Sequence, residues 1–262
     1  MQKGEALCRR GRRLIRSCAI AASCALCAAA GGAAGEAPFS RIFGPLAATA
    51  VDTAGVACVS LRLANPYSID GLVSSLVEAE ADGGAAVACV RYYRLSHALY
   101  AEDRLFCAIA FETPFPGVMI GGESGFLRRG AKGYRGERSF PARFVAVWRR
   151  GRSASIRLAA PVFESGAASR VRSAWSCDVS CGAVGFGVAA FSPDGLAMER
   201  RLEAAAALGA RTTVGASYAW RSGELSTGVR FEIRRCILGF EWSVHPLLGV
   251  TASAKAGRRW VW

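Results

Sequence analysis

The last fifty residues alternate with a period of two, and this pattern constrains the fold more than any other feature of the chain. Between Glu224 and Arg234 every second residue is apolar or β-branched, and the residues between them are polar, charged or glycine. This is the period of a β-strand, whose side chains point alternately to the two faces of a sheet. Residues 212–220 alternate in the same way, and Arg221-Ser222-Gly223 has the composition of a tight turn. The two segments predict a β-hairpin.

Further alternating segments follow one another from Gly84 onward, separated by proline, glycine or basic residues. Residues 139–148 and 153–162 predict a second hairpin, whereas residues 196–208 suit either a helix or a strand. In all, the pattern predicts about ten to twelve strands of about eight to ten residues. We therefore expect an all-β chain, folded as an antiparallel up-and-down β-barrel of about 10–12 strands.

One helix is expected at the start of this barrel. Ser68 can cap a short amino-terminal helix in which Ile69, Leu72, Val73 and Leu76 recur at helical spacing. The simpler interpretation places this helix at one end or on the rim of the barrel. The alternative is a plug or latch over the lumen.

Residues 1–35 have the organisation of a secretory signal peptide. Six basic residues precede an apolar run from Ser17 to Ala30, and small residues follow for cleavage. A helix needs about 20 apolar residues to cross a bilayer, so this run is short for a permanent anchor. We expect an exported chain in which residues 36–262 form a single domain.

The mature chain stays basic after the leader is removed. Residues 1–35 contribute a net +5 of the formal +13, which leaves +8. An exported chain rarely meets nucleic acid, and no nucleic-acid-binding motif accompanies the arginines, so nucleic acid is not expected as a partner. Anionic lipid, lipopolysaccharide-like head groups and anionic solutes are better candidates, and a merely solvated basic surface is the simplest alternative.

Six cysteines remain after the leader. Their even number permits disulfides in an oxidising compartment, but six cysteines allow about 15 pairings and the sequence does not choose among them. Cys177 and Cys181 would share a face of a strand yet lie too far apart along it to bond, unless the chain turns at residues 178–180. Neither His97 nor His245 has a ligand partner at a recognisable spacing, so we expect no metal and no cofactor. The six are Cys58, Cys89, Cys107, Cys177, Cys181 and Cys236.

The predicted strand length matches a transmembrane β-barrel, whose strands cross the hydrocarbon with about 9 to 11 residues. An arginine that faced lipid at the midplane would cost roughly 2 to 4 kcal/mol. Arg157, Arg230 and Glu232 are therefore the candidates for lumen-facing residues, whereas Phe231, Ile156 and Leu158 should face outward.

The chain ends Trp260-Val261-Trp262. An aromatic terminal residue with another aromatic two positions earlier resembles the last strand of bacterial outer-membrane β-barrel proteins. The resemblance implies that Trp260 and Trp262 form an assembly signal for the outer-membrane assembly machinery, in a porin-like protein surrounded by outer-membrane lipid. Arg258 departs from the pattern, because an apolar residue would be expected there.

A narrower resemblance is carried by Asn65-Pro66 followed by Leu72, by Gly133-Tyr134 in a basic loop and by the glycine-rich terminal hairpins. These features resemble the FadL/PorV-type barrels of spirochaetes and related bacteria, although Tyr67 stands where that family has alanine. The resemblance implies passage or binding of hydrophobic molecules, with the amino-terminal segment inside the lumen.

The sequence thus favours a non-enzymatic outer-membrane barrel with a passive transport or a structural and surface role. Its solutes would be small and either anionic or hydrophobic, and lumen arginines such as Arg230 would favour anions in an open pore. Two alternatives stay open. A soluble periplasmic β-sandwich or ligand-binding barrel predicts that Phe231 and Tyr218 lie in its core, and a rim-sited hydrolase would need His97 or His245 as its base.

Overall fold

The computed structural model describes residues 56–83, 85–133, 136–150, 154–165, 174–181, 183–191 and 199–261. The predicted signal peptide lies outside these residues. Within them, strands dominate and form one continuous sheet.

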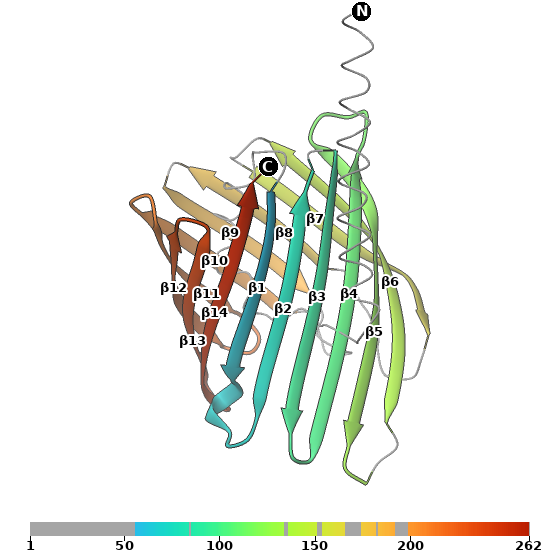
Figure 1. Cartoon of the computed structure of the whole chain (residues 1–262), viewed down its shortest axis with the longest axis vertical. Helices are drawn as coiled ribbons and strands as arrows, with labels where there is room; N and C mark the ends of the chain where they lie inside the picture. Colours follow the sequence, from blue (N-terminus) through green and yellow to red (C-terminus); the bar gives the residue numbers. More distant parts are fainter. Residues whose placement is uncertain are drawn as a thin grey trace, which may run out of the picture.

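Fourteen strands occur in the described part of the chain, and each runs antiparallel to its neighbours. Each strand pairs with the next one along the chain, and β1 also pairs with β14, so the sheet closes into a barrel (Figure 1). The up-and-down antiparallel order agrees with the prediction. The strands are β1 (Val56–Asn65), β2 (Val73–Asp82), β3 (Ala86–His97), β4 (Tyr100–Glu112), β5 (Val118–Ala131), β6 (Glu137–Arg150), β7 (Ala154–Ser165), β8 (Ala174–Cys181), β9 (Val184–Phe191), β10 (Glu199–Leu208), β11 (Thr212–Ala219), β12 (Leu225–Ile233), β13 (Cys236–His245) and β14 (Gly249–Val261).

The predicted count of about ten to twelve strands was too low, and the predicted amino-terminal helix is wrong. Residues 73–82 form β2, which pairs with β1 and β3 and so satisfies its backbone hydrogen bonds within the sheet. The helical spacing of the apolar residues there was coincidental, and a single 3-10 turn, η3 (Pro66–Ser68), precedes the strand. The ambiguous segment 196–208 supplies another strand, β10.

Among the described residues, no helix is long and apolar enough to cross a membrane.

The two faces of the sheet differ in an unusual way. Along β13 exposed and buried residues alternate, and four of the exposed residues are large and apolar. Leu238, Phe240, Trp242 and Val244 are exposed on the outer face, whereas Glu241 and Ser243 are buried on the inner face. A soluble β domain would show the reverse, because water favours burial of apolar surface. On β13 the polar side chains Glu241 and Ser243 therefore face inward.

The two ends of the barrel differ in the length of the segments that join the strands. At the short-turn end, where β14 finishes, the connections contain two to five residues and lie at 83–85, 113–117, 151–153, 182–183, 209–211 and 234–235. At the long-loop end, the lower end in Figure 1, they contain two to eight residues and lie at 66–72, 98–99, 132–136, 166–173, 192–198, 220–224 and 246–248.

Candidate functional site: the charged inner wall

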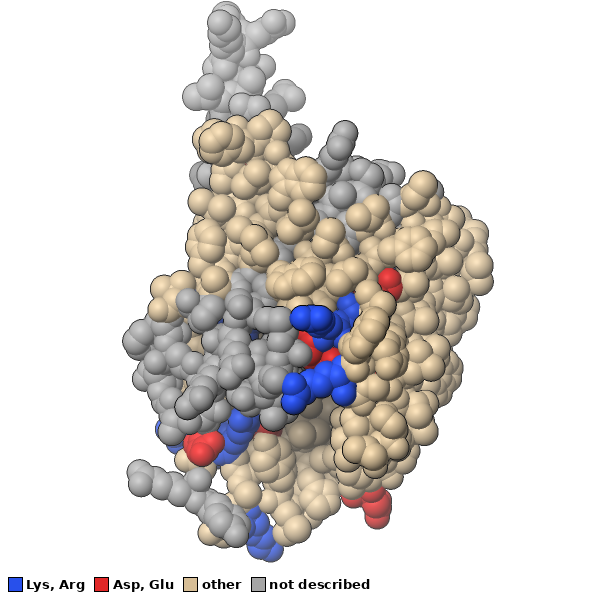
Figure 2. All heavy atoms as spheres, turned by 180° about the vertical axis from the view of Figure 1, so that it is seen from behind, with Lys and Arg blue, Asp and Glu red and all other residues tan. Residues whose placement is uncertain are grey.

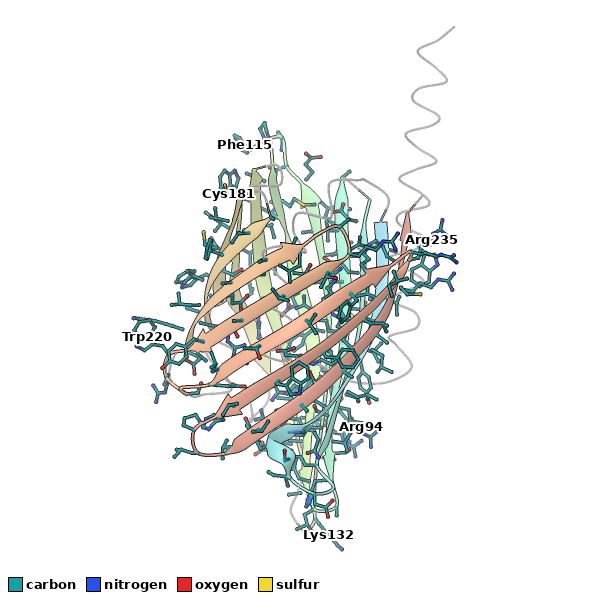
Figure 3. The ribbon with its side chains drawn as sticks, turned by 90° about the vertical axis from the view of Figure 1, so that its left-hand side faces the viewer. Arg94, Phe115, Lys132, Cys181, Trp220 and Arg235 are labelled. Atoms are coloured by element: carbon teal, nitrogen blue, oxygen red, sulfur yellow. The ribbon has the colours of Figure 1, made fainter. Side chains whose placement is uncertain are left out.

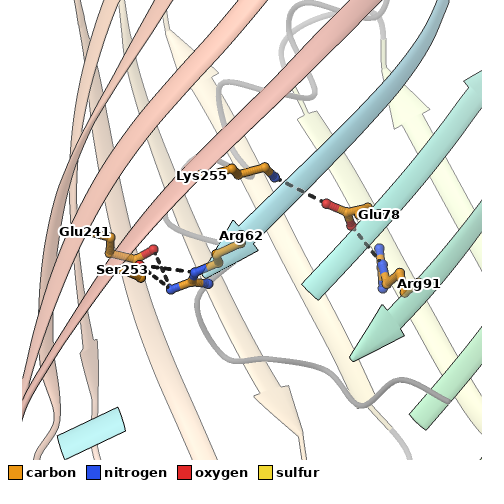
Figure 4. A network of polar contacts seen from close by, with 6 residues as sticks. All are labelled: Arg62, Glu78, Arg91, Glu241, Ser253 and Lys255. Atoms are coloured by element: carbon orange, nitrogen blue, oxygen red, sulfur yellow. Dashed lines mark hydrogen bonds and ion pairs between the residues drawn. The ribbon is translucent and has the colours of Figure 1, made fainter. Parts of the chain in front are cut away.

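Charged side chains and one serine, from five neighbouring strands, form polar contacts on the inner wall of the barrel (Figure 4). The alternation of each strand brings them there, because every second residue points inward. The members are Glu241 on β13, Ser253 and Lys255 on β14, Arg62 on β1, Glu78 on β2 and Arg91 on β3.

Arg62 forms the buried half of this network. Its Nη2 donates to Glu241 Oε2 at 3.0 Å and to Ser253 Oγ at 2.9 Å, and its Nε donates to the same hydroxyl at 3.1 Å. The side chains of Arg62 and Glu241 are only 7% and 8% exposed. Removing one partner of such a pair leaves an uncompensated buried charge, which costs about 3 to 5 kcal/mol.

Glu78 forms the other half and is shared by two cations. Its Oε1 accepts a hydrogen bond from Arg91 Nε at 2.9 Å, and its Oε2 accepts one from Lys255 Nζ at 3.3 Å. Lys255 reaches Glu78 across β1, where the small Ser60 stands opposite Glu78 in the register. One carboxylate thus balances two cations that lie on β3 and β14.

Two more ion-pair clusters line the strands that follow. The Glu102 carboxylate accepts hydrogen bonds from Tyr100 Oη, from Arg104 Nε and, at 3.1 Å, from Arg129 Nε. Farther along, Arg143 Nη1 lies 3.4 Å from Glu123 Oε1. These cations are also paired with carboxylates.

Exposure of the paired side chains varies around the barrel. Arg91 and Lys255 are 32% and 30% exposed, whereas Arg201 on β10, whose Nη2 lies 3.9 Å from Glu224 Oε2, is only 2% exposed. Figure 2 shows lysine, arginine and acidic side chains gathered in a hollow, with a surrounding surface that is mostly uncharged. Arg91 and Lys255 are therefore more accessible to water than Arg201.

Arg230 and Glu232, two of the predicted lumen residues, occupy inner-face positions of β12. Arg230 Nη2 lies 3.4 Å from Glu232 Oε2, and Arg259 Nη1 of β14 lies 2.6 Å from Glu232 Oε1. In the register, Gly239 of β13 separates Arg230 from Lys255, so the two cations share a row. Arg157 lies in β7 opposite Val147 and Ser176, and its side chain is outside the described part of the structure.

The residues that were predicted to face outward lie on the outer face of the sheet. Ile156 and Leu158 are exposed, and Phe231 is half-buried at an outer-face position of β12. Tyr218 is exposed beside Trp220, with a ring separation of 6.1 Å. The soluble alternative placed Phe231 and Tyr218 in a core, and that prediction is wrong because both lie on the outer face.

The carboxy-terminal strand closes the barrel. Trp260 pairs in register with Ala57 of β1, and Trp262 lies outside the described residues. Arg258, where an apolar residue was expected, is exposed on the outer face and places its guanidinium 5.6 Å from the centre of the Trp260 ring. At the end of the strand, such a position leaves the charge close to the rim, where water can solvate it.

At the long-loop end, the η3 turn after β1 makes hydrogen bonds to β14, the strand that pairs with β1 to close the barrel. The Tyr67 backbone N–H donates to Thr251 Oγ1 at 2.8 Å, and Ser68 Oγ donates to the Val250 carbonyl at 3.0 Å. Burial, reinforced by the charge of Glu224, raises the pKa of the Tyr67 phenol. The η3 turn thus fastens the β1–β2 connection to β14, and a plug or latch over the lumen, the alternative interpretation of the expected helix, has no support in these contacts.

The two histidines act as turn residues. His97 Nδ1 accepts a hydrogen bond from the Leu99 N–H at 3.3 Å, and His245 Nδ1 accepts one from the Leu247 N–H at 3.2 Å. This is the simpler role for both, and it leaves the hydrolase alternative without support from the geometry.

The cysteines and metal ligands add little to the site. The six cysteines that the structure describes are free, and Cys177 and Cys181 lie on one face of β8, as expected. Within the described ranges, no group of three or more histidine, cysteine or acidic residues could hold a metal ion.

Sequence reasoning missed the Arg62, Glu78 and Glu241 network. A signal for part of it was present, since Thr251, Ser253 and Lys255 alternate with alanines along β14. The ion pairs themselves depend on the register between strands, which the alternation does not specify.

Comparison with solved structures finds proteins of similar fold. No protein-family model matches the chain, and no curated protein sequence matches it. The solved structure of the outer-membrane protein Omp33 of Acinetobacter baumannii is similar, with a TM-score of 0.50 and 10% identity over 79% of this chain and 98% of that chain. A mutant of Rh. blastica porin has a TM-score of 0.45 and 10% identity over the same shares. The likeness to Omp33 indicates a shared β-barrel fold.

Proposed function

We propose that the chain is an outer-membrane β-barrel that lets small polar and charged solutes pass passively through its lumen. The observation that carries this proposal is the arrangement of the two faces, with large apolar side chains exposed outside and charged side chains paired inside. The barrel fold shared with Omp33 supports it. The predicted signal peptide would export the chain from the cytoplasm.

A lipid environment accounts for the outer face. Thirty-five large apolar residues are exposed in the described part of the chain, a number that would favour aggregation in water but suits contact with acyl chains. Tyr218, Trp220 and Trp242 lie toward the long-loop end, and Trp148 and Trp260 toward the short-turn end. Aromatic residues concentrate at both interfaces of membrane barrels, so this distribution fits a transmembrane position.

The orientation follows from the connections. Membrane barrels have short periplasmic turns and longer extracellular loops. We therefore assign the short-turn end to the periplasm and the long-loop end to the cell exterior. Trp260 would then lie at the periplasmic side, where the outer-membrane assembly machinery could bind the terminal strand.

The inner wall decides which solutes are favoured. Fourteen strands enclose more space than about eight strands, whose interior is just filled by side chains. Arg230, expected to favour anions, is paired with Glu232, and the cations Arg91 and Lys255 share Glu78. Balanced charges of this kind favour small hydrophilic solutes of either sign over the hydrophobic molecules that a FadL/PorV-type barrel would carry. That finer resemblance stays a prediction.

Conductance in planar lipid bilayers tests the proposal. We expect the purified mature protein to produce discrete ion-conducting steps with weak selectivity between cations and anions. Glu78→Gln would leave Arg91 and Lys255 without their shared carboxylate, and the reversal potential in a salt gradient should shift toward anions. Glu112→Gln is the matched control, because Glu112 is exposed at the short-turn end and forms no ion pair with a described residue.

The two variants need a folding check before their conductance is compared. Folded barrels in detergent migrate differently on gels before and after boiling, and both variants should show that shift. A folded wild-type protein without conductance would contradict passive transport and leave a structural or surface role. Equal reversal potentials for the two variants would show that Glu78 does not face the conducting path.

A further inference from the structure

Four charged residues form a row across the outer face of β3–β6 near the long-loop end. Arg94 of β3 stands opposite Asp103 of β4, Asp103 opposite Arg128 of β5, and Arg128 opposite Arg138 of β6. Figure 3 shows Arg94 projecting away from the barrel wall toward the end that also carries Lys132. The row has three cations and one anion.

Within the described part of the chain, no carboxylate other than Asp103 pairs with the cations of this row. Asp103 Oδ1 lies 3.9 Å from Arg94 Nε and accepts a hydrogen bond from Tyr92 Oη at 3.4 Å. Arg128 and Arg138 are both exposed, and neither forms an ion pair with a residue that the structure describes. Like charges directly opposite each other on neighbouring strands are destabilising. On the inner wall, by contrast, Arg62 and Arg91 each have a carboxylate partner.

An aromatic pair lies on the same face, one step toward the middle of the barrel. The rings of Phe126 and Phe140 are 5.1 Å apart, and Phe140 is 52% exposed. Each phenylalanine is two residues from one of the facing arginines on its own strand. An amphiphile bound here would meet apolar rings nearer the middle of the barrel and guanidinium groups nearer its rim.

We propose that Arg94, Arg128 and Arg138 bind the phosphorylated head group of a lipid in the membrane leaflet at the long-loop end. A phosphate between Arg128 and Arg138 would remove their mutual repulsion, and each guanidinium fork matches phosphate oxygens in a bidentate geometry. The acyl chains would pack against Phe126 and Phe140. This site goes beyond the transport proposal, because it requires a membrane position but no open lumen.

Lipid-dependent stability of the detergent-folded mature protein tests the site. We expect phosphatidate to raise the unfolding temperature, and phosphatidylcholine with the same acyl chains to raise it much less. Arg128→Gln combined with Arg138→Gln should weaken phosphatidate binding by about tenfold or more, since two charge-assisted contacts are lost. In the matched control variant, Gln replaces Arg234 and Arg235, which lie at the opposite end of the barrel.

Three outcomes decide the proposal. Loss of the phosphatidate effect in the Arg128/Arg138 variant, with the effect retained in the Arg234/Arg235 variant, supports a lipid site in the row. An equal phosphatidate effect in both variants overturns it. An equal rise in unfolding temperature with inorganic phosphate alone also overturns it, because the row would then bind a free anion.

Discussion

At the scale of single residues, the close approach of neighbouring strands limits which side chain a position can hold. Amino-acid composition does not show this limit. Gly121 of β5 is such a position, since a Cβ atom there would lie 1.8 Å from the Ile109 carbonyl oxygen and 2.6 Å from the Ala110 Cα. Both contacts are with backbone, which cannot rotate away as a side chain would. The β4–β5 pair therefore requires glycine at this position.

Gly121→Ala should impair folding of the barrel. Alanine normally stabilises a chain slightly where its conformation is compatible, by restricting the unfolded state, so a loss here would report the steric clash. We expect a smaller folded fraction on unboiled gels after refolding into detergent. Gly130→Ala on the same strand is the control, because a Cβ there would meet no atom within 4 Å. Equal folded fractions would contradict the close approach.

Sequence could predict which face many residues occupy, but not their partners. The period of two placed Arg230 and Glu232 on one face of a strand, and both occupy inner-face positions. Arg62 and Glu241 are 179 residues apart in the chain and meet only because β1 and β13 both flank β14. That proximity depends on barrel closure and on register, which local periodicity does not contain.

At the scale of elements, one buried carboxylate organises a connection at the long-loop end. Glu199, the first residue of β10, accepts hydrogen bonds from the backbone N–H groups of Arg221 at 2.8 Å and Ser222 at 3.1 Å. It also accepts one from its neighbour Arg200 at 3.2 Å. These contacts hold the 220–224 turn between β11 and β12 against β10.

Glu199→Ala should loosen the 220–224 turn without opening the sheet. The two backbone N–H groups of the turn would lose their acceptor, which costs about 1 to 3 kcal/mol for each group that stays buried. Limited trypsin digestion should then cleave after Arg221 faster than in the wild type. Cleavage after Arg211, in the 209–211 turn at the opposite end, should keep its rate. Unchanged cleavage after Arg221 would show that the turn is held by other contacts.

The sequence did not correctly predict two of the elements, and each error has a physical reason. Residues 69–76 have apolar residues at helical spacing, yet β1 and β3 offer β2 a complete set of backbone partners, and tertiary pairing overrides such a local pattern. Alanine dominates the second half of β10, and alanine favours helices in isolation, so its strand was not evident. The hairpin of β11 and β12 was predictable because its alternation and its turn composition agree.

At the scale of the whole molecule, the barrel has a charged interior and an apolar exterior. This arrangement leaves paired ions such as Arg62 and Glu241 inside and rings such as Phe240 and Trp242 outside. Closure of β1 on β14 removes the exposed strand edges that would otherwise be costly in lipid. An apolar exterior and a closed sheet are both required of a β-sheet protein that spans a membrane.

Tryptophan fluorescence tests this central claim most directly. The chain has six tryptophans, and Trp148, Trp175, Trp220 and Trp242 are exposed on the outside of the barrel. In vesicles, lipids brominated on their acyl chains should quench most of the emission, whereas aqueous iodide should quench little of it. Strong quenching by iodide together with weak quenching by brominated lipids would contradict a transmembrane barrel.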